Sequence, residues 1–245
     1  MAIHADALFC ISRSVSEETA NYMRGRFALN DSSPKIDWFH LGASTPPDTS
    51  APLPESFALR EIIGGPARPT VLMVGTLEPR KGHAQTLDAF ESLWNQGERA
   101  TLVIAGRQGW KVDALVERIK NHAEFGKRLF WLAGAKDADI AGLYHHLDGL
   151  LVASEAEGFG LPLIEAAQHG MPLFLRDLPV FREVAGEHAT YFIAQNGLQL
   201  ASQLLTWLNQ LADKTAQTTR QMHTLTWATS SEQLKALLAK LDLQN

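Results

Sequence analysis

Cysteine is almost absent from this sequence. Its 245 residues include one cysteine, Cys10, which excludes an intramolecular disulfide framework and a zinc site built from several cysteines. Cys10 lies within the apolar run Ala7–Ile11, where we expect a buried thiol without a chemical role. A chain of this length is ample for a conventional hydrophobic core, so we expect the fold to rest on one.

Long apolar runs and an excess of positive charge are also missing. No segment approaches the roughly 20 apolar residues of a membrane-spanning helix, and no basic and apolar leader opens the chain. Lysine and arginine number 22 against 27 aspartate and glutamate, which gives a net charge of −5. This balance argues against a nucleic-acid partner. We expect a cytoplasmic protein, with at most peripheral association at the inner face of the membrane.

Two common phosphate-binding signatures do not occur in the chain. The dinucleotide fingerprint G-x-G-x-x-G is missing after the first main strand, and so is a phosphate loop ending in G-K-S/T. These absences argue against a nicotinamide-dependent dehydrogenase and against a P-loop ATPase.

Proline is concentrated in one stretch. The segment Thr45–Pro54 reads TPPDTSAPLP, a composition typical of an irregular linker. Before it, the apolar run Asp6–Ile11 predicts a strand, and Ser14 or Ser16 is expected to cap the helix that follows. We therefore divide the sequence into a leading strand and helix at 1–35, a hinge and proline-rich linker at 36–69, a main domain at 70–225 and a C-terminal helix at 226–245.

The main domain alternates short apolar runs with stretches of helical periodicity. The runs lack polar alternation, as expected for parallel strands that are covered on both faces. Repeated strand–helix units predict a doubly wound, Rossmann-like parallel α/β sheet. The expected strands are Thr70–Val74, Thr101–Ala105, Leu129–Leu132, Leu150–Ala153, Pro172–Leu175 and Tyr191–Ile193.

Two loops of this sheet are the richest in glycine and charge. In a doubly wound sheet, ligands bind beyond the carboxyl ends of the strands, where the strand order reverses. With a strand order of 3-2-1-4-5-6, that point lies between the first and fourth strands. The loop after the first strand is Gly75–Gly82 (GTLEPRKG), and the loop after the fourth is Ser154–Pro162 (SEAEGFGLP). We therefore expect a ligand between these two loops.

The residues in these loops suit a diphosphate. Arg80 and Lys81 supply two cations, and Gly158 and Gly160 permit backbone N–H groups to approach an anion closely. A helix that begins near Pro162 directs its positive end to the same place. Taken alone, the two cations are more typical of a solvated charged turn; their placement opposite the glycines favours a site.

Glu157 and Glu165 are separated by seven residues across the junction of loop and helix. A carboxylate at either position could accept hydrogen bonds from paired sugar hydroxyls, such as those of a ribose. Glu165 could instead only stabilise the helix N-terminus, and Glu157 could be a solvated loop residue. The residue types leave both alternatives open.

The stretches Val74–Gly82 (VGTLEPRKG) and Glu157–Ala166 (EGFGLPLIEA) resemble the nucleotide-sugar domain of retaining glycosyltransferase family 4. The second stretch contains the E-x7-E element of that family, and Asp177–Gly186 resembles its next segment. The sequences of these stretches are most similar to those of bacterial mannosyltransferase-like enzymes of surface-polysaccharide and lipopolysaccharide assembly. By this resemblance, the chain is the C-terminal half of a GT-B fold, in which two facing Rossmann-like domains enclose the active site.

The resemblance implies a substrate and a missing part. The donor would be a nucleotide diphosphate sugar, with GDP-mannose favoured, and the acceptor a glycan or a lipid-linked glycan. No metal and no other cofactor would be needed, because protein cations take the place of a metal. Residues 1–35 would be the end of an N-terminal acceptor-side domain. The rest of that acceptor side would be a missing N-terminal domain or a partner chain.

The resemblance also assigns roles to residues. Arg80 and Lys81 would hold the diphosphate, Glu157 would contact the donor sugar, and Glu165 would bind the ribose. Thr76 stands where many relatives carry an arginine, so Arg80 would carry more of the phosphate charge. The remaining donor-binding residues implied in this way are Gly75, Thr76, Gly106, Arg107, Ala133, Gly158, Phe159, Gly160 and Leu161.

Two further functions are compatible with the same residues. The chain could be a truncated, non-catalytic module that binds nucleotide sugars, or a sugar-nucleotide epimerase built on the same two-domain plan. An epimerase needs no acceptor, so analysis of the product would separate it from a transferase.

Overall fold

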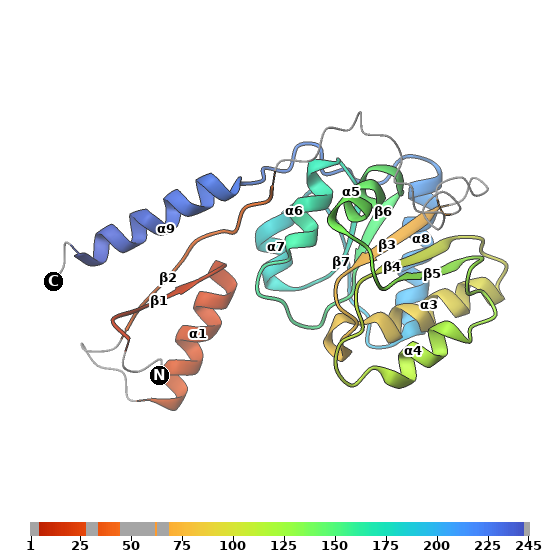
Figure 1. The fold of residues 1–245 in the computed structure, drawn as a ribbon, viewed down its shortest axis with the longest axis horizontal. Helices are drawn as coiled ribbons and strands as arrows, with labels where there is room; N and C mark the ends of the chain where they lie inside the picture. The colour runs from red at the N-terminus through yellow and green to blue at the C-terminus, as the bar shows by residue number, and fades with distance from the viewer. Residues whose placement is uncertain (1–4, 28–33, 45–61, 63–68, 243–245) are drawn as a thin grey trace.

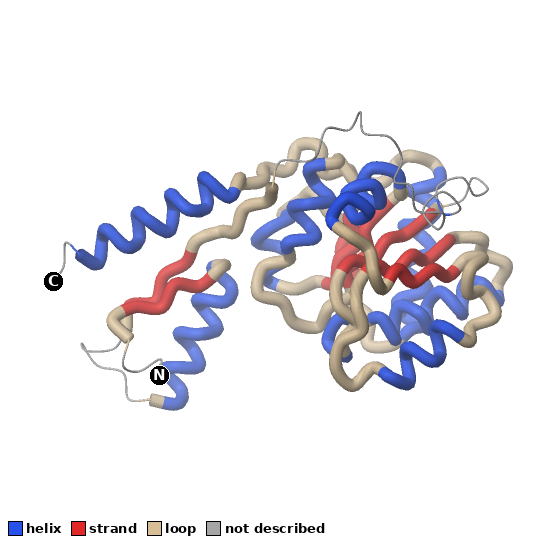
Figure 2. The backbone as a smooth tube through the Cα atoms, in the orientation of Figure 1, coloured by secondary structure: helices blue, strands red, loops and turns tan. Residues whose placement is uncertain are grey.

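The computed structural model describes residues 5–27, 34–44, 62 and 69–242. Its main body is a parallel sheet with helices on both faces (Figures 1 and 2). The order of the strands across the sheet is β5-β4-β3-β6-β7-β8, which confirms the doubly wound prediction and the order 3-2-1-4-5-6. The strands are β3 (Thr70–Val74), β4 (Thr101–Ala105), β5 (Leu129–Leu132), β6 (Gly149–Val152), β7 (Leu173–Arg176) and β8 (Thr190–Phe192).

Successive residues of each strand pack against two different helical layers. Val71 and Met73 of β3 belong to the core cluster that contains residues of α3 (His83–Asn95), α4 (Asp113–Lys120) and α8 (Gly197–Ala212). Leu72 belongs to the opposite cluster, with residues of α5 (Asp137–His146), α6 (Leu161–Gln168) and α7 (Pro179–Ala185). Burial on both faces explains why these strands are continuous apolar runs.

The predicted strand limits hold to within one residue. β3, β4 and β5 begin and end where predicted, whereas β6, β7 and β8 are each displaced by one residue. β6 begins one residue early, at Gly149, where the ring of Trp207 occupies the space that a side chain would need. Glycine is depleted in strands, so no sequence pattern predicts that Gly149 pairs with Val71.

The N-terminal part forms a small unit of its own. β1 (Ala7–Cys10) and β2 (Lys35–Trp38) pair in parallel, and α1 (Arg13–Arg26) contacts both strands. We call these three elements the leading unit. Ser12 caps α1, since its hydroxyl accepts a hydrogen bond from Val15 N at 3.2 Å. The expectation that Ser14 or Ser16 is the cap is therefore wrong.

The last helix, α9 (Trp227–Asp242), extends away from the main body and runs beside the leading unit (Figure 1). The Ser230 hydroxyl of α9 donates to the carbonyl of His40 at 2.7 Å. The proline-rich stretch Thr45–Pro54 lies outside the described residues, and the division into domains stays a prediction. Of the helices described, none is long and apolar enough to cross a membrane.

Candidate functional site

The two loops predicted to face each other do so at the carboxyl ends of β3 and β6. A short 3₁₀ turn, η2 (Pro79–Lys81), follows β3 and touches the loop after β6. Glu155 N donates to Arg80 O at 2.8 Å, and an Arg80 guanidinium nitrogen donates to Ala156 O at 3.0 Å. Gly82 ends the turn at a φ of 72°, and a Cβ there would lie 2.3 Å from Ala153 O. The backbones approach so closely that only glycine fits.

Glu157 is the centre of a compact charged cluster. Lys81 Nζ donates to Glu157 Oε1 in a short ion pair, and an Arg80 nitrogen lies 3.4 Å from Glu157 Oε2. The Ser154 hydroxyl donates to Glu157 Oε1 at 2.8 Å. The Glu157 side chain is 13% exposed and that of Arg80 is 43% exposed, so the outer guanidinium remains open to solvent. Arg80 also pairs with Glu78 at 3.1 Å.

The first turn of α6 adjoins this cluster. Gly160 precedes the helix with a φ of 96°, and no side chain caps it. Pro162 carries no N–H, and Leu163 N donates to Gly160 O at 2.9 Å, so the Leu161 N–H is the donor that this first turn offers to an anion. Phe159 is buried in the core of the main body, which leaves the backbone of this glycine-flanked residue, and not its side chain, for a ligand.

Glu165 lies on α6 and lines a separate part of the site. The Tyr144 hydroxyl of α5 donates to Glu165 Oε2 at 2.9 Å. Burial raises the pKa of Glu165, and the bond from Tyr144 opposes that rise. Burial, together with the charge of Glu165, raises the pKa of Tyr144 well above its usual value, so the hydroxyl keeps its proton.

Glu165 and Tyr144 line a cavity of about 630 Å³. It lies between α5, α6, the carboxyl end of β3 and the segment just after the leading unit, where Ala43 contributes to its wall. Asp137, at the first turn of α5, is also part of the lining. A carboxylate held by one hydroxyl in a partly apolar cavity suits the binding of a small ligand with vicinal hydroxyl groups.

The other predicted residues lie at the same edge of the sheet, around the ends of β4 and β5. Gly75 N donates to Ala105 O at 3.0 Å, and a Cβ on Gly106 would lie 1.9 Å from Gly75 O. Leu77 N donates to Arg107 O at 2.8 Å. Thr76, Arg107 and Ala133 are exposed there. The structure thus brings Arg80, Lys81 and Glu157 into contact and places the glycines where backbones meet, while Glu165 is part of the cavity.

Two residues of the site were not predicted from the sequence. Tyr144 and Ser154 hold the two glutamates, and a tyrosine on a helix or a serine after a strand gives no distinctive pattern. His83, the first residue of α3, is 2% exposed. Burial and the charge of Lys81 lower the pKa of His83 to about 4, so the imidazole is neutral at pH 7 and adds no charge to the cluster.

Metal ligands do not gather at this site. Within the described ranges, no three His, Cys, Asp or Glu side chains are arranged to hold an ion. An Asp-x-Asp triplet occurs at Asp137–Asp139, at the start of α5. Asp139 accepts a hydrogen bond from Lys136 N at 2.9 Å and so serves as part of the helix cap.

Comparison with known proteins identifies the family. Residues 59–223, more than half of the chain, match the family described as glycosyl transferases group 1. The chain belongs to this family. The serotype-specific mannosyltransferase WbdA of Escherichia coli is 42% identical over 237 residues, which are 95% of this chain and 29% of WbdA. The family resemblance drawn from the sequence is thereby confirmed, and the chain spans less than a third of that relative.

Solved structures give the fold of this group 1 member. HepE of Anabaena, crystallised with UDP-glucose, has a TM-score of 0.73 at 17% identity over 98% of this chain and 65% of HepE. Sucrose-phosphate synthase of Thermosynechococcus elongatus has a TM-score of 0.71 at 21% identity over 100% of this chain and 60% of the synthase. At these identities the likeness concerns the fold alone, and it confirms the GT-B architecture.

Proposed function

We propose that this chain is the donor-binding half of a retaining glycosyltransferase. It transfers a hexose, mannose in this proposal, from a nucleotide diphosphate sugar to a glycan or lipid-linked acceptor in polysaccharide synthesis of the O-antigen type. The observation that carries the proposal is the contact of Arg80, Lys81 and Glu157 beside the first turn of α6. The identity to a mannosyltransferase supports the sugar and favours GDP-mannose as the donor.

The proposed chemistry is electrostatic. As the bond between the sugar's anomeric carbon and the phosphate oxygen breaks, negative charge grows on the departing diphosphate. Arg80, Lys81 and the Leu161 N–H at the start of α6 lie together where they can stabilise that charge. Without a donor, Glu157 holds Lys81 in place; with a donor bound, phosphate oxygens take over that cation, and the carboxylate turns to the sugar hydroxyls. The cations supply the charge that a metal would, so we propose that no metal or other cofactor takes part.

The nucleoside occupies the other side of the site in this proposal. Glu165, oriented by Tyr144, accepts hydrogen bonds from the ribose hydroxyls in the cavity. The base lies toward the exposed residues after β4 and β5, among which are Arg107 and Ala133. The acceptor binds to the N-terminal domain of the whole enzyme or to a partner chain, and the leading unit is the final part of that acceptor side.

Thermal-shift and calorimetric titrations of this chain with GDP, UDP, ADP, GDP-mannose and UDP-glucose test the proposal. We expect GDP and GDP-mannose to bind selectively, and a ligand at one hundred times its dissociation constant to stabilise the fold by about 2.7 kcal/mol. Lys81→Ala should weaken GDP-mannose binding by about tenfold or more, since it removes a charge-assisted contact. Arg99→Ala is the matched control, because Arg99 is an exposed cation just before β4, at the opposite edge of the sheet.

The result also separates the alternatives. If no nucleotide binds, or if Lys81→Ala binds as the unaltered chain does, the donor site is misplaced. GDP-mannose binding without transfer to any acceptor by the whole protein would indicate a non-catalytic binding module. Conversion of the sugar nucleotide in the absence of an acceptor would indicate an epimerase.

A further inference from the structure

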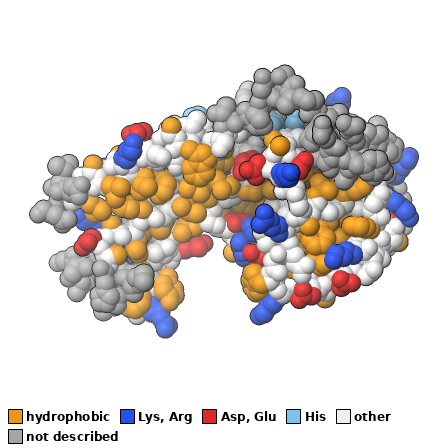
Figure 3. All heavy atoms as spheres, viewed as in Figure 1, with side chains coloured by type: hydrophobic (Ala, Val, Ile, Leu, Met, Phe, Trp, Pro, Cys, Tyr) orange, Lys and Arg blue, Asp and Glu red, His pale blue; other side chains and the backbone are white. Residues whose placement is uncertain are grey.

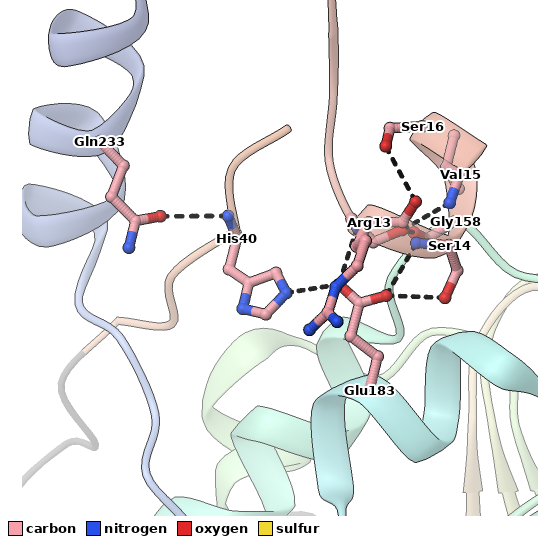
Figure 4. A network of polar contacts seen from close by, with 9 residues as sticks. Arg13, Ser14, Val15, Ser16, His40, Gly158, Glu183 and Gln233 are labelled. Carbon is pink, nitrogen blue, oxygen red and sulfur yellow. Dashed lines mark hydrogen bonds and ion pairs between the residues drawn. The ribbon is translucent and has the colours of Figure 1, made fainter. Parts of the chain in front are cut away.

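A second polar network joins the leading unit to the main body beside the Glu157 loop (Figure 4). Its centre is Glu183 of α7, whose side chain is 6% exposed. Glu183 Oε1 accepts from Arg13 N at 2.7 Å, and Oε2 accepts from Ser14 N at 2.8 Å and from the Ser14 hydroxyl at 2.6 Å. One carboxylate of the main body thus satisfies the first two N–H groups of α1.

The same carboxylate holds the segment that follows β2. Glu183 Oε1 lies 2.7 Å from His40 Nε2. The His40 backbone is fixed from the other side by α9, since His40 N donates to Gln233 Oε1 at 3.1 Å. α7 is therefore tied to the start of α1, to the segment after β2 and, through His40, to the last helix.

These contacts reach the loop that carries Glu157. The Ser12 hydroxyl, which accepts from Val15 N, donates to Gly158 O at 2.8 Å. A Cβ on Gly158 would lie 3.0 Å from Ile11 Cδ1, so the turn before α1 rests directly on this glycine. The ring of His40 also packs on Phe159, with 5.4 Å between ring centroids. The position of the Gly158–Phe159 backbone is thus coupled to the start of α1.

The ionised state of Glu183 agrees with this geometry. Burial acts to raise the pKa of Glu183, but the hydrogen bonds from Ser14, His40 and the Arg13 and Ser14 backbone outweigh it, and the pKa lies below its usual range. A carboxylate at the N-terminus of α1 is favourable both to the free N–H groups and to the helix dipole.

We propose that Glu183 is a positioning residue that latches the leading unit to the main body and thereby fixes the Gly158–Leu161 backbone for the diphosphate and sugar of the donor. The proposal rests on the proposed function, but the latch itself can be tested without a ligand. Glu183 does not touch the charged cluster of Arg80, Lys81 and Glu157 in any described contact, so it acts through Ser12 and His40.

The test compares Glu183→Gln, Ser14→Ala and, as the matched control, Glu187→Gln in the chain as it stands. Glu187 is an exposed carboxylate two residues after α7. Ser14→Ala removes one hydrogen bond from a half-buried side chain, so it keeps the test decisive if Glu183→Gln does not fold. Without ligand, chymotryptic cleavage after Phe159 should be about tenfold faster in Glu183→Gln, as expected for the loss of one charged hydrogen bond, and unchanged in Glu187→Gln.

The second measurement tests whether Glu183 positions the Gly158–Leu161 backbone for the donor. GDP-mannose should bind Glu183→Gln about tenfold more weakly, whereas GMP, which lacks the second phosphate and the mannose, should bind as it does to the unaltered chain. A purely structural role would weaken both ligands together, and equal losses overturn the proposal. Unchanged cleavage and unchanged GDP-mannose affinity in both Glu183→Gln and Ser14→Ala also overturn it. If the unaltered chain binds no nucleotide, the proposed function fails, while faster cleavage still establishes the latch.

Discussion

At the scale of single residues, contacts between residues that are far apart in the chain hold the charged groups of the site. Arg80, Lys81 and Glu157 come together because β3 and β6 are neighbours, and the topology rule supplied that contact. Three residues that hold other groups in place were not predicted: Tyr144, Ser154 and Glu183. Tyr144 and Glu183 contact residues that are distant in sequence, and a serine after a strand is too common to be distinctive. Glu183 meets Arg13 and Ser14 across about 170 residues, and no local pattern marks such a pair.

The buried imidazole of His83 makes the stability depend on pH. Its pKa is lowered to about 4, against about 6.5 in an unfolded chain. Between these values the unfolded state binds more protons, so the free energy of unfolding falls as the pH decreases from 6.5 to 4, by up to about 3 kcal/mol. Urea unfolding across this range should show a shallower fall for His83→Leu. The exposed His223→Leu serves as control; if His83→Leu leaves the pH profile unchanged, His83 is not buried as a neutral ring.

At the scale of elements, hydrophobic pattern was sufficient for the sheet and insufficient for the helix ends. Runs buried on both faces gave the strands to within one residue. The N-terminal cap of α1 was predicted at the wrong serine, because the contacts that select Ser12 are not visible in the local sequence. Three serines stand in the window 12–16, and the choice among them depends on Gly158 and Glu183, which lie in another part of the fold.

Two glycines with a positive φ allow the cost of backbone strain to be measured apart from the cost of a steric clash. Gly82 has a φ of 72° and would place a Cβ 2.3 Å from Ala153 O, whereas Gly97 has a φ of 93° with nothing within 4 Å. Gly97→Ala should cost about 1 kcal/mol of the free energy of unfolding, from strain alone. Gly82→Ala should cost about 3 kcal/mol or more, since it also forces the two loops apart. Urea unfolding measures both, and equal costs would mean that the loops tolerate separation.

At the scale of the whole molecule, the apolar side chains are distributed unevenly. The main body covers its sheet on both faces, whereas apolar side chains gather on the surface over α9 and the leading unit (Figure 3). Leu238 of α9 is 46% exposed and Tyr22 of α1 is 62% exposed. A pair of strands with two helices cannot bury all the apolar surface it presents, so this part of the chain offers an exposed apolar face.

This unevenness predicts concentration-dependent self-association of the chain. Sedimentation velocity over a range of concentrations should show a rising weight-average sedimentation coefficient. Leu238→Lys places a charge on the apolar face of α9 and removes about 1 kcal/mol of the free energy of association that burial of Leu238 contributes. The association constant should therefore fall about fivefold. Leu198→Lys is the control, because Leu198 is 71% exposed on α8 in the main body. Equal effects of the two variants would assign association to general surface hydrophobicity, and a concentration-independent coefficient for the unaltered chain would show that the face over α9 is not adhesive.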